Sequence, residues 1–493
     1  MSWFILWLYE CFISDILRKW VFFYAVRINN RYVLIFKERK EKMKQKRSTF
    51  TGGLGFVMAA ASSAIGLGNI WRFPYLAAKY GGSAFLIVYI ILVVTFGFAL
   101  MTAEIVIGRK TGHGPLTAFS VLNKKWGFIG FLATLVPVLI LPYYNVIGGW
   151  VVNYTVGYLG GAYQGMAADN YFTDMLANPV KLIIVQVIFT AAITAIIMCG
   201  VTKGIERASK VLMPILLILA VAISVYSITL PGAMDGVKYF FVPNMQHFSI
   251  KGVLAAMGQM FFSLSLAMGI MVAYGSYLPK SSDIEKSVSQ IEIFDTLIAI
   301  LAGLMIIPAV FAFSGGDESA LGKGPGLMFV TLPKVFASMP GTRIAGIMFF
   351  VLVLFAALTS AMSVMEAIVA SLCDKYKISR NKAALLSAAW SVVGGVVCIL
   401  GYSVLSGVKF GSMDILDTVD FLTNSVFMPV TALLTCIFVG YILDKDTVKN
   451  EITSSGKFGR EKIFNVMIKY IAPIFVVAVL ISSVLDSLGV IKF

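Results

Sequence analysis

The chain has 493 residues, of which 59% are hydrophobic and 13% are charged, and its mean hydropathy is +0.87. Soluble domains carry about 25% charged residues, so this composition excludes an ordinary soluble protein and predicts a chain that lies mostly in lipid. The formal net charge of +15 does not indicate a nucleic-acid partner, because the Lys and Arg residues cluster between apolar runs. Two histidines, and five cysteines without metal-binding spacing, leave little material for an enzyme's catalytic site.

Residues 1–46 form an N-terminal extension that differs from the rest of the chain. The segment is rich in aromatic side chains but also carries acidic and basic ones, and a basic run follows at residues 37–47. Three interpretations stay open: a cytoplasmic or interfacial helix with a basic juxtamembrane segment, an extra span, or an artefact with Met43 as the natural start. We assign this extension no function.

Apolar segments long enough to cross a bilayer recur along the remaining chain. They lie at about 53–78, 83–107, 127–159, 181–200, 209–230, 252–278, 288–313, 344–372, 383–402, 413–442 and 467–488. These segments predict about eleven transmembrane helices in a single domain of residues 47–490. Several exceed the minimum length of about 20 residues, so tilted or broken helices are expected.

The charges of the connecting segments predict the orientation in the plasma (inner) membrane. Basic residues follow the second, fourth, eighth and tenth spans. They are Arg109, Lys110, Lys124, Lys125, Lys203, Arg207, Lys210, Lys375, Lys377, Arg380, Lys382, Lys445, Lys449, Lys457, Arg460 and Lys462. Segment 160–180 has two acidic residues and none that is basic. The positive-inside rule then places the N-terminus in the cytoplasm and the C-terminus outside.

The longest outer connection is segment 314–342, which is rich in glycine and proline at its start. Residues Met328 to Ala337 within it are predicted to form a short helix over the bundle. A lid over an outer vestibule and a plain connector both remain open.

The first and sixth spans each carry small and hydroxyl residues near their midpoint, at 59–69 and 262–269. An unwound stretch survives in hydrocarbon only where it lines a cavity, because each unpaired backbone group costs about several kcal/mol. If spans one to five and six to ten are two halves, both interruptions fall in the first helix of a half. That pattern indicates a site at the bilayer midplane between inverted repeats. The alternative is that the glycines only allow close helix packing.

Several motifs occur together and in order, namely Gly66-Leu-Gly-Asn-Ile-Trp-Arg-Phe-Pro-Tyr75, Glu104 with Gly108-Arg109, Tyr143-Tyr144, Trp150, Gly258-Gln-Met-Phe-Phe-Ser-Leu-Ser265, Leu358-Thr359-Ser360, and Asp417 with Asp420. With them, the sequence from Arg47 to about Leu488 resembles the neurotransmitter:sodium symporter family, in its bacterial eleven-span type. The resemblance implies an all-α, polytopic five-plus-five inverted-repeat fold with helices 1 and 6 broken. Repeat one would cover about 50–230 and repeat two about 251–442, with a final helix at about 467–488.

The function that the resemblance implies is sodium-coupled uptake of an amino acid by alternating access. Two sodium sites are expected and no organic cofactor, whereas no oligomeric state is indicated. The first site would use Ala64, Asn69, Ser263 and Asp295; the second would use Ser62, Ile65, Ala356, Thr359 and Ser360. An acid at Asp295 would supply the negative charge that chloride supplies in other members, which predicts chloride independence. The alternative places Asp295 near the cytoplasmic end, in water.

The implied substrate site is Ala64, Gly66, Leu67, Gly68, Ile140, Tyr144, Phe262, Ser263, Ser265, Met268, Ser360 and Val364. Monoamine carriers of the family have an acid where this chain has Gly66, so a substrate that brings its own carboxylate is predicted. The apolar walls favour a hydrophobic or aromatic amino acid. Ala267 departs from the glycine of related sequences, which leaves aliphatic and aromatic substrates both open.

Pairs of charged residues at the two ends of the site resemble gates. Arg72 and Asp420, with Gln259 alongside, would form the outer gate, and Arg47 and Asp374, with Tyr277 nearby, the inner one. Static salt bridges are the alternative. Glu104 is predicted to accept hydrogen bonds from unwound backbone, while Glu366 receives no role. Competing functions are a sodium-independent amino acid carrier of the same fold, a channel and a membrane-embedded enzyme.

Overall fold

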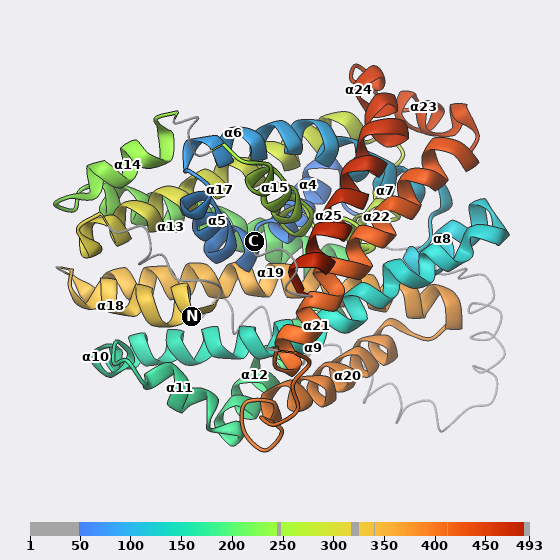
Figure 1. Cartoon of the computed structure of the whole chain (residues 1–493). Helices are drawn as coiled ribbons and strands as arrows, with labels where there is room; N and C mark the ends of the chain where they lie inside the picture. The colour runs from blue at the N-terminus through green and yellow to red at the C-terminus, as the bar shows by residue number, and fades with distance from the viewer. Residues whose placement is uncertain (1–48, 244–247, 317–324, 340, 412, 488–493) are drawn as a thin grey trace, which may run out of the picture.

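The structure is a computed structural model that describes residues 49–243, 248–316, 325–339, 341–411 and 413–487 (Figure 1). The described residues are almost entirely helical, and their only β-type pairing is one isolated bridge between Phe410 and Met413. The predicted all-α fold is therefore confirmed. The predictions for residues 1–46 and for Arg47 lie outside the described residues.

Nine helical units of the described part are each long and apolar enough to cross a membrane alone. They are α6 (Ser83–Leu92) with η4 (Val93–Gly97) and α7 (Phe98–Thr111); η5 (Lys124–Trp126) with α9 (Gly127–Gly160); α12 (Pro179–Met198); η6 (Val201–Glu206) with α13 (Arg207–Ile228); α17 (Ile284–Ser314); α19 (Thr342–Tyr376); α20 (Arg380–Leu400); α21 (Ile415–Phe421) with η10 (Leu422–Phe427), α22 (Met428–Ile437) and η11 (Phe438–Ile442); and α24 (Glu461–Val466) with η12 (Met467–Ile471) and α25 (Ala472–Ser487).

Two further spans are interrupted. The first consists of α4 (Gly53–Ala64), then η3 (Gly68–Arg72) and α5 (Phe73–Lys79), with a bend of 51° at the break. The sixth consists of α15 (Ile250–Ser263) and α16 (Ile270–Gly275), separated by six non-helical residues, 264–269. The eleven predicted segments thus all find a helical counterpart, and the predicted interruptions fall in the first and the sixth of them.

One predicted boundary is wrong. The fifth span was expected to begin at residue 209, but it begins at Val201, so Lys203 and Arg207 lie in its first turns and not in a loop. Charged residues at this end are accommodated by local partners: the carboxylate of Glu206 accepts hydrogen bonds from Lys210 Nζ at 2.6 Å and from the Thr51 amide at 2.9 Å. Hydropathy detects only the apolar part of a span. It therefore misses a polar helix end whose charged residues find partners nearby.

Short helices gather at the two ends of the bundle. At the left of Figure 1 lie α10 (Tyr163–Met166), α11 (Tyr171–Leu176), α14 (Ala233–Phe241) and α18 (Leu332–Ala337), which continues η9 (Leu327–Thr331). At the right lie α8 (Pro115–Leu122), α23 (Lys445–Thr453) and α24. The helix predicted for Met328 to Ala337 is thus confirmed as η9 and α18.

Aromatic rings hold η9 onto the bundle. The ring of Phe329 lies 5.7 Å from that of Trp150, 5.4 Å from that of Phe172 and 6.5 Å from that of Trp71, between ring centroids. On α18, Lys334 forms a salt bridge with the exposed Asp169, and this hydrogen bond lowers the pKa of the Asp169 carboxyl below its usual value. The α18 segment is therefore attached to both the third span and the segment that follows it.

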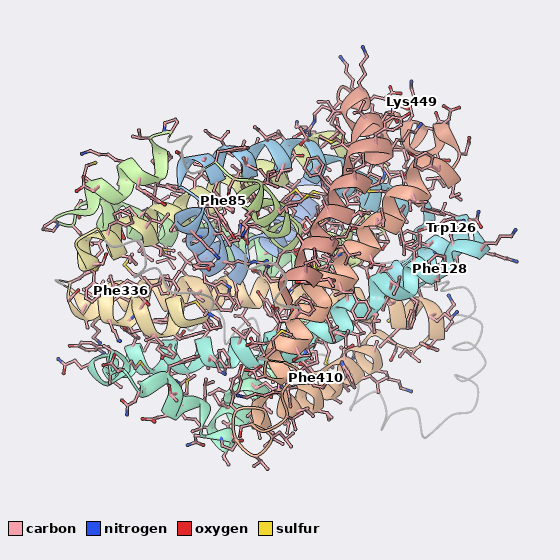
Figure 2. All side chains as sticks on the ribbon, viewed as in Figure 1. Phe85, Trp126, Phe128, Phe336, Phe410 and Lys449 are labelled. Carbon is pink, nitrogen blue, oxygen red and sulfur yellow. The ribbon has the colours of Figure 1, made fainter. Side chains whose placement is uncertain are left out.

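Equivalent spans of the two predicted halves pack against each other. The third and eighth spans are in contact through α9 and α19, the fourth and ninth through α12 and α20, and the second and seventh through α7 and α17. The first and sixth meet where η3 contacts α15. Side chains fill the space between these helices, while large apolar ones such as Phe128 and Phe410 project from the outside (Figure 2). Both broken spans also contact α19, which brings the two interruptions to the middle of the bundle.

Candidate functional site

The first interruption starts where α4 ends. Ile65 leaves the helical conformation, with φ −79° and ψ 82°, and the helix resumes at Gly68. Only short-range backbone hydrogen bonds bridge the break, from Gly66 N to the Ala64 carbonyl at 3.0 Å and from Asn69 N to the Gly66 carbonyl at 3.2 Å. The peptide groups around Gly66 therefore lie outside the regular helical ladder and face the neighbouring spans.

The two glycines of this break are required by close packing. A Cβ atom on Gly66 would lie 2.6 Å from Ser360 Oγ, and one on Gly68 would lie 2.4 Å from the ring of Phe262. Neither glycine has a positive φ. Close helix packing, the alternative explanation, thus accounts for glycine at these two positions. It does not account for the interruption itself, because the helix is broken at Ile65 as well.

The second interruption carries backbone strain. Ser265, Ala267 and Gly269 have φ values of 54°, 59° and 71°, in the left-handed region that non-glycine residues rarely adopt. Such a conformation costs about 1–3 kcal/mol for each non-glycine residue and persists only where the surroundings impose it. Part of that support comes from Glu104, whose buried carboxylate accepts a hydrogen bond from Ala267 N at 2.7 Å. The predicted role of Glu104 as an acceptor for unwound backbone is confirmed.

A cavity of about 20 Å³ lies between the two interruptions. It is lined by Ser63, Ala64, Gly66, Gly68, Asn69, Ile140, Tyr144, Phe262, Ser265, Met268, Ser360 and Val364. Ten of these twelve belong to the predicted substrate site; Leu67 and Ser263, also predicted, lie beside the cavity without lining it. The volume is close to that of one water molecule, so a larger molecule fits only if the flexible walls move apart.

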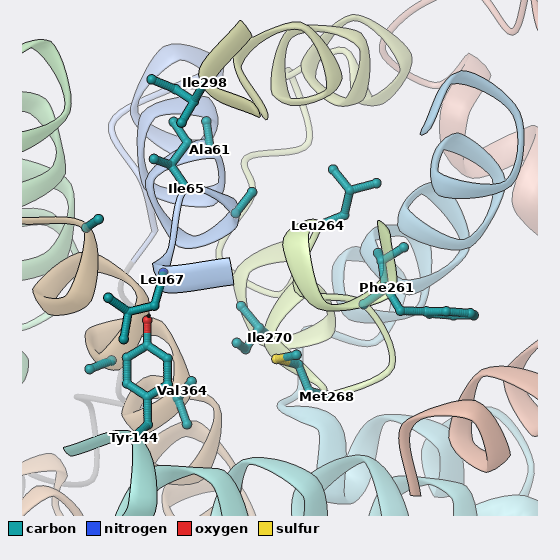
Figure 3. Close-up of a cluster of buried hydrophobic side chains, with 14 of the residues drawn as sticks. Ala61, Ile65, Leu67, Tyr144, Phe261, Leu264, Met268, Ile270, Ile298 and Val364 are labelled. Carbon is teal, nitrogen blue, oxygen red and sulfur yellow. Dashed lines mark hydrogen bonds between the residues drawn. The ribbon is translucent and has the colours of Figure 1, made fainter. Parts of the chain in front are cut away.

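Tyr144 points its hydroxyl group at the first interruption. The Leu67 amide donates a long hydrogen bond of 3.5 Å to this hydroxyl, and Figure 3 shows the ring between Leu67 and Val364, opposite Met268. Tyr144 comes from α9 and Val364 from α19, so the two longest helices of the bundle supply one side of the cavity. The site is thus built from four spans, two interrupted and two continuous.

Next to the cavity, four buried polar side chains form one cluster. Asp295 Oδ1 accepts hydrogen bonds from Asn69 Nδ2 at 2.9 Å and from Ser263 Oγ at 2.5 Å. Its other oxygen, Oδ2, accepts a hydrogen bond of 2.6 Å from the Tyr89 hydroxyl. Asp295 has no exposed surface, so the alternative that it lies in water is wrong.

Tyr89 was not predicted from the sequence as a residue of the site. Its hydroxyl also lies 2.9 Å from Ser263 Oγ, so Tyr89 contacts two residues of the predicted first sodium site. The only local signal is a single phenolic hydroxyl within the apolar run 83–92, and aromatic residues are common in such runs. Tyr89 reaches Ser263 because the second span packs against the sixth.

The residues predicted for the second sodium site lie where the end of α4 meets α19. Ser360 Oγ donates a hydrogen bond of 3.0 Å to the Ser63 carbonyl, which connects the two helices at the break. Thr359 Oγ1 contacts carbonyls of its own preceding turn, those of Phe355 at 3.0 Å and Ala356 at 3.1 Å. The side chain of Ser62 turns away toward Ser209 Oγ on α13, at 2.9 Å, and Ile65 packs near Ile298 (Figure 3).

The atoms in both clusters that could ligate a cation are oxygens, and together they carry little negative charge. Hydroxyl, amide and carbonyl oxygens with a single carboxylate suit a monovalent cation better than the carboxylate-rich cages of Ca²⁺. The described residues contain no group of three or more His, Cys, Asp or Glu side chains arranged for a transition metal. The chemistry of the donors therefore fits an alkali cation.

Comparison with known proteins identifies the family. The sequence profile of the Sodium:neurotransmitter symporter family matches residues 47–164 and 173–490. The chain belongs to this family. The sodium-dependent transporter YhdH of Bacillus subtilis is 35% identical over 457 residues, which cover 91% of this chain and 100% of YhdH. The sodium-dependent serotonin transporter of Drosophila melanogaster is 24% identical over 508 residues, which cover 93% of this chain and 79% of that protein.

A solved structure extends the likeness to three dimensions. The crystal structure of MhsT in complex with L-phenylalanine superposes with a TM-score of 0.81 at 37% identity, covering 89% of this chain and 100% of MhsT. The five-plus-five fold with interrupted first and sixth helices is thereby confirmed. The chain is a multi-pass, sodium-dependent membrane transporter, and its family consists of transporters rather than enzymes.

Two of the three residues predicted for the outer gate of this symporter, Gln259 and Arg72, contact residues that line the cavity. Gln259 Nε2 donates a hydrogen bond of 3.0 Å to the Gly68 carbonyl, and the Arg72 guanidinium lies 5.9 Å from the centroid of the Phe262 ring. Asp420 accepts a hydrogen bond of 2.7 Å from Asn424 Nδ2. Arg72 faces the charge of Asp420, but no direct salt bridge joins these two described residues.

At the predicted inner gate, two helices are joined by a pair of residues that the sequence did not predict. Arg380 holds Glu366 with two hydrogen bonds, of 2.9 and 2.5 Å, and donates a third, of 2.7 Å, to the Ile197 carbonyl. The predicted gate residue Tyr277 donates a hydrogen bond of 2.7 Å to the same carboxylate, Glu366 Oε1. Asp374 accepts a hydrogen bond of 2.5 Å from Gly114 N, and its predicted partner Arg47 lies outside the described residues.

Replacing Glu366 with glutamine is expected to destabilise the contacts at the predicted inner gate. Glu366 is fully buried, and losing one partner of a buried ion pair costs about 3–5 kcal/mol, because the Arg380 charge remains without compensation. The expected result is a lower thermal unfolding midpoint in detergent and faster alkylation of Cys373, which lies two turns beyond Glu366 on the same helix. Lys382→Gln, an exposed change on α20, is the matched control. A Glu366→Gln midpoint equal to that of the control would contradict the role of this pair.

Proposed function

We propose that this transporter takes up an amino acid together with sodium by alternating access, driven by sodium moving down its gradient. The observation that carries the proposal is the cavity between the two interruptions, with the Asn69–Ser263–Asp295 cluster beside it and the Ser63–Ser360 contact at its wall. Backbone groups released at both interruptions give this cavity the ligands that a cation and a carboxylate need.

The substrate keeps its carboxylate in this proposal. At Gly66 the cavity wall has no side chain, and the nearby donors are the amides at the start of η3 and the Tyr144 hydroxyl. A helix N-terminus with free N–H groups favours an anion. A decarboxylated amine would instead need a counter-ion, and the cavity-lining residues include no acidic side chain.

Two sodium ions accompany the substrate. The first is proposed to bind the Ala64 carbonyl, the Asn69 side chain, Ser263, Asp295 and the substrate carboxylate. The second is proposed to bind the carbonyls of Ser62, Ile65 and Ala356 and the hydroxyls of Thr359 and Ser360. The Asp295 carboxylate supplies a fixed negative charge at the first ion, which supports transport without chloride.

A hydrophobic or aromatic amino acid is the proposed substrate. The side of the cavity away from the amides is lined by Ile140, Phe262, Met268 and Val364, which are apolar. The thioether of Met268 can adapt to bulky groups. MhsT, which is 37% identical to this chain, was crystallised with L-phenylalanine, and this supports an aromatic side chain as the first candidate.

The two gates alternate in the proposed cycle. Substrate and sodium enter from outside, Arg72 and Asp420 with Gln259 close above them, and the α18 segment covers this side as a lid. Release follows when the inner side opens, where Arg47, Asp374 and Tyr277 act together with the Glu366–Arg380 pair. The N-terminus is proposed to be cytoplasmic and the C-terminus external in the plasma membrane, in line with the basic residues at one end.

The deciding experiment is a binding screen of the twenty amino acids against the purified protein, with sodium or with potassium. Hydrophobic and aromatic amino acids are expected to raise the thermal unfolding midpoint in sodium only. Phenethylamine, which lacks the carboxylate of phenylalanine, is expected to bind at least 100-fold more weakly. Undiminished binding in potassium would support a sodium-independent carrier of the same fold.

Tyr144→Phe tests the carboxylate anchor without changing the shape of the cavity. A hydrogen bond to a charged group contributes about 1.5–3 kcal/mol, so the variant is expected to bind amino acids about 10- to 100-fold more weakly. Equilibrium binding of the amino acid found in the screen measures the change. Tyr226→Phe, on α13 away from the cavity, is the control and should bind as the wild type does. Equal affinities for the two variants would contradict the anchor.

A further inference from the structure

A second cavity lies at the end of the bundle where the tenth and eleventh spans are joined. It measures about 370 Å³ and is lined by Val439, Gly440, Asp446, Val448, Lys449, Phe458, Glu461, Phe464, Asn465, Val466, Lys469 and Tyr470. Except for Phe458, which lies between α23 and α24, these residues come from η11, α23, α24 and η12, at the upper right of Figure 1, and Lys449 is labelled there in Figure 2. The cavity shares no residue with the substrate cavity.

Two π-helical turns supply residues that line this cavity. The tenth span ends in η11 and the eleventh contains η12, and the two turns contact each other. An inserted residue widens a helix locally, and such turns occur frequently at functional sites. The Tyr441 hydroxyl donates a hydrogen bond of 2.5 Å to the Lys469 carbonyl, so a backbone group of η12 is satisfied from η11. A Cβ atom on Gly440 would lie 3.3 Å from Lys469 Cγ, so the lysine stem packs directly on the tenth span.

Helix α23 forms another wall of the cavity, and contacts with residues outside the cavity hold it in place. Arg109 Nε donates a hydrogen bond of 2.8 Å to Glu451 Oε1, and Lys280 Nζ lies 2.5 Å from the same oxygen. Both Arg109 and Glu451 are buried. These contacts tie α23 to the second span and to the segment that follows the sixth.

Of the four charged side chains that line the cavity, two form a salt bridge with each other and two do not. Lys449 and Glu461 form a salt bridge of 3.1 Å across the cavity rim. Asp446 and Lys469 have no ion-pair partner among the side chains that the structure describes. The cavity therefore presents one free anion and one free cation, which together complement a ligand with both charges.

The surroundings of the cavity face lipid. Tyr441 and Tyr470, at the ends of their spans, are 59% and 61% exposed, as in the aromatic belts at membrane interfaces. Val466, Tyr470 and Ile474 follow at intervals of four residues, so these exposed side chains form one stripe along the eleventh span. The stripe begins at the cavity and runs toward the centre of the bilayer.

We propose that this cavity binds the headgroup of a phospholipid that carries a phosphate and a primary ammonium, as phosphatidylethanolamine does. The phosphate contacts Lys469, the ammonium donates hydrogen bonds to Asp446, and an acyl chain lies along the stripe from Val466 to Ile474. Phosphatidylcholine fits less well because its trimethylammonium has no N–H donor. Phosphatidylglycerol has no cation, so Asp446 would face an anionic lipid unpaired.

The test is lipid binding to the purified full-length transporter, measured by native mass spectrometry with phosphatidylethanolamine, phosphatidylcholine and phosphatidylglycerol of identical acyl chains. Wild type is expected to bind phosphatidylethanolamine about tenfold tighter than the other two. Lys469→Gln is expected to lose about tenfold in affinity for phosphatidylethanolamine. In Asp446→Asn, the preference for phosphatidylethanolamine over phosphatidylcholine should disappear.

Lys462→Gln is the matched control, because Lys462 is an exposed lysine of α24 that does not line the cavity. Sodium-dependent amino acid binding by each variant verifies its folding. Equal binding of the three lipids by wild type, or wild-type affinity in Lys469→Gln, would overturn the proposal. Soluble glycerophosphoethanolamine is a further competitor: the proposal fails if it displaces the lipid at an equal concentration, because the acyl stripe would then contribute nothing.

Discussion

Replacing Asp295 with serine is expected to make sodium-driven uptake depend on chloride. In the structure three donors, Asn69 Nδ2, Ser263 Oγ and the Tyr89 hydroxyl, converge on the Asp295 carboxylate. The variant loses the negative charge but leaves donors that suit a small anion. Two unit charges about 4 Å apart interact by about 4 kcal/mol at an effective dielectric constant of about 20, so sodium binding should weaken at least 100-fold without chloride.

The measurement is uptake into proteoliposomes in chloride and in gluconate. Wild-type flux is expected to be equal in both media, whereas Asp295→Ser should be almost inactive in gluconate and recover in chloride. Asp235→Ser, on the exposed surface of α14, is the control and should behave as wild type does. A wild-type flux that collapses in gluconate would show that chloride, and not Asp295, provides the charge at the first sodium ion.

Gly66→Asp is expected to abolish amino acid binding. A Cβ atom at this position lies 2.6 Å from Ser360 Oγ and 3.4 Å from the Tyr144 hydroxyl, so the new carboxylate would occupy the space proposed for that of the substrate. Like charges in a buried site repel strongly. Affinity for the amino acid identified by the screen should fall by more than 100-fold, as measured by equilibrium binding in sodium.

Gly66→Ala separates the steric part of this effect from the electrostatic part. The alanine variant introduces the same close contact with Ser360 without a charge, so it is expected to keep a measurable part of the affinity. Phenethylamine should bind Gly66→Asp better than Gly66→Ala, because the aspartate provides a counter-ion for an amine. The same affinity for the amino acid in the aspartate and alanine variants would argue against a carboxylate subsite at Gly66.

The lipid site and the Glu366–Arg380 pair share one physical feature. Both are built by charged residues that lie within predicted apolar spans, Glu366 in 344–372 and Lys469 in 467–488. Glu366 is fully buried, and Lys469 packs its stem on Gly440. Charged groups in the spans find partners on other helices, and we propose that the transporter uses them for closure and for lipid recognition.

The sequence by itself determined the membrane-spanning architecture and the place of both interruptions. Hydropathy is a local property, and the free-energy cost of polar backbone in lipid is large, so eleven spans and their two breaks are readable without any contact information. The role of Glu104 was also predictable, because a buried acid near an unwound helix has few other partners. Ten of the twelve residues expected around the substrate line one cavity, since the motif order reflects a shared fold.

Only the tertiary structure decided which distant groups meet. The Tyr89 contact to Asp295 joins residues that are 206 positions apart, and Arg380 reaches Glu366 from the neighbouring span. The first turns of the fifth span, which begins at Val201 and thus earlier than hydropathy indicates, are joined to Thr51 through Glu206, across 155 positions. Such pairings arise from the packing of whole helices against one another, and no local pattern of residues specifies which face of a helix meets which partner.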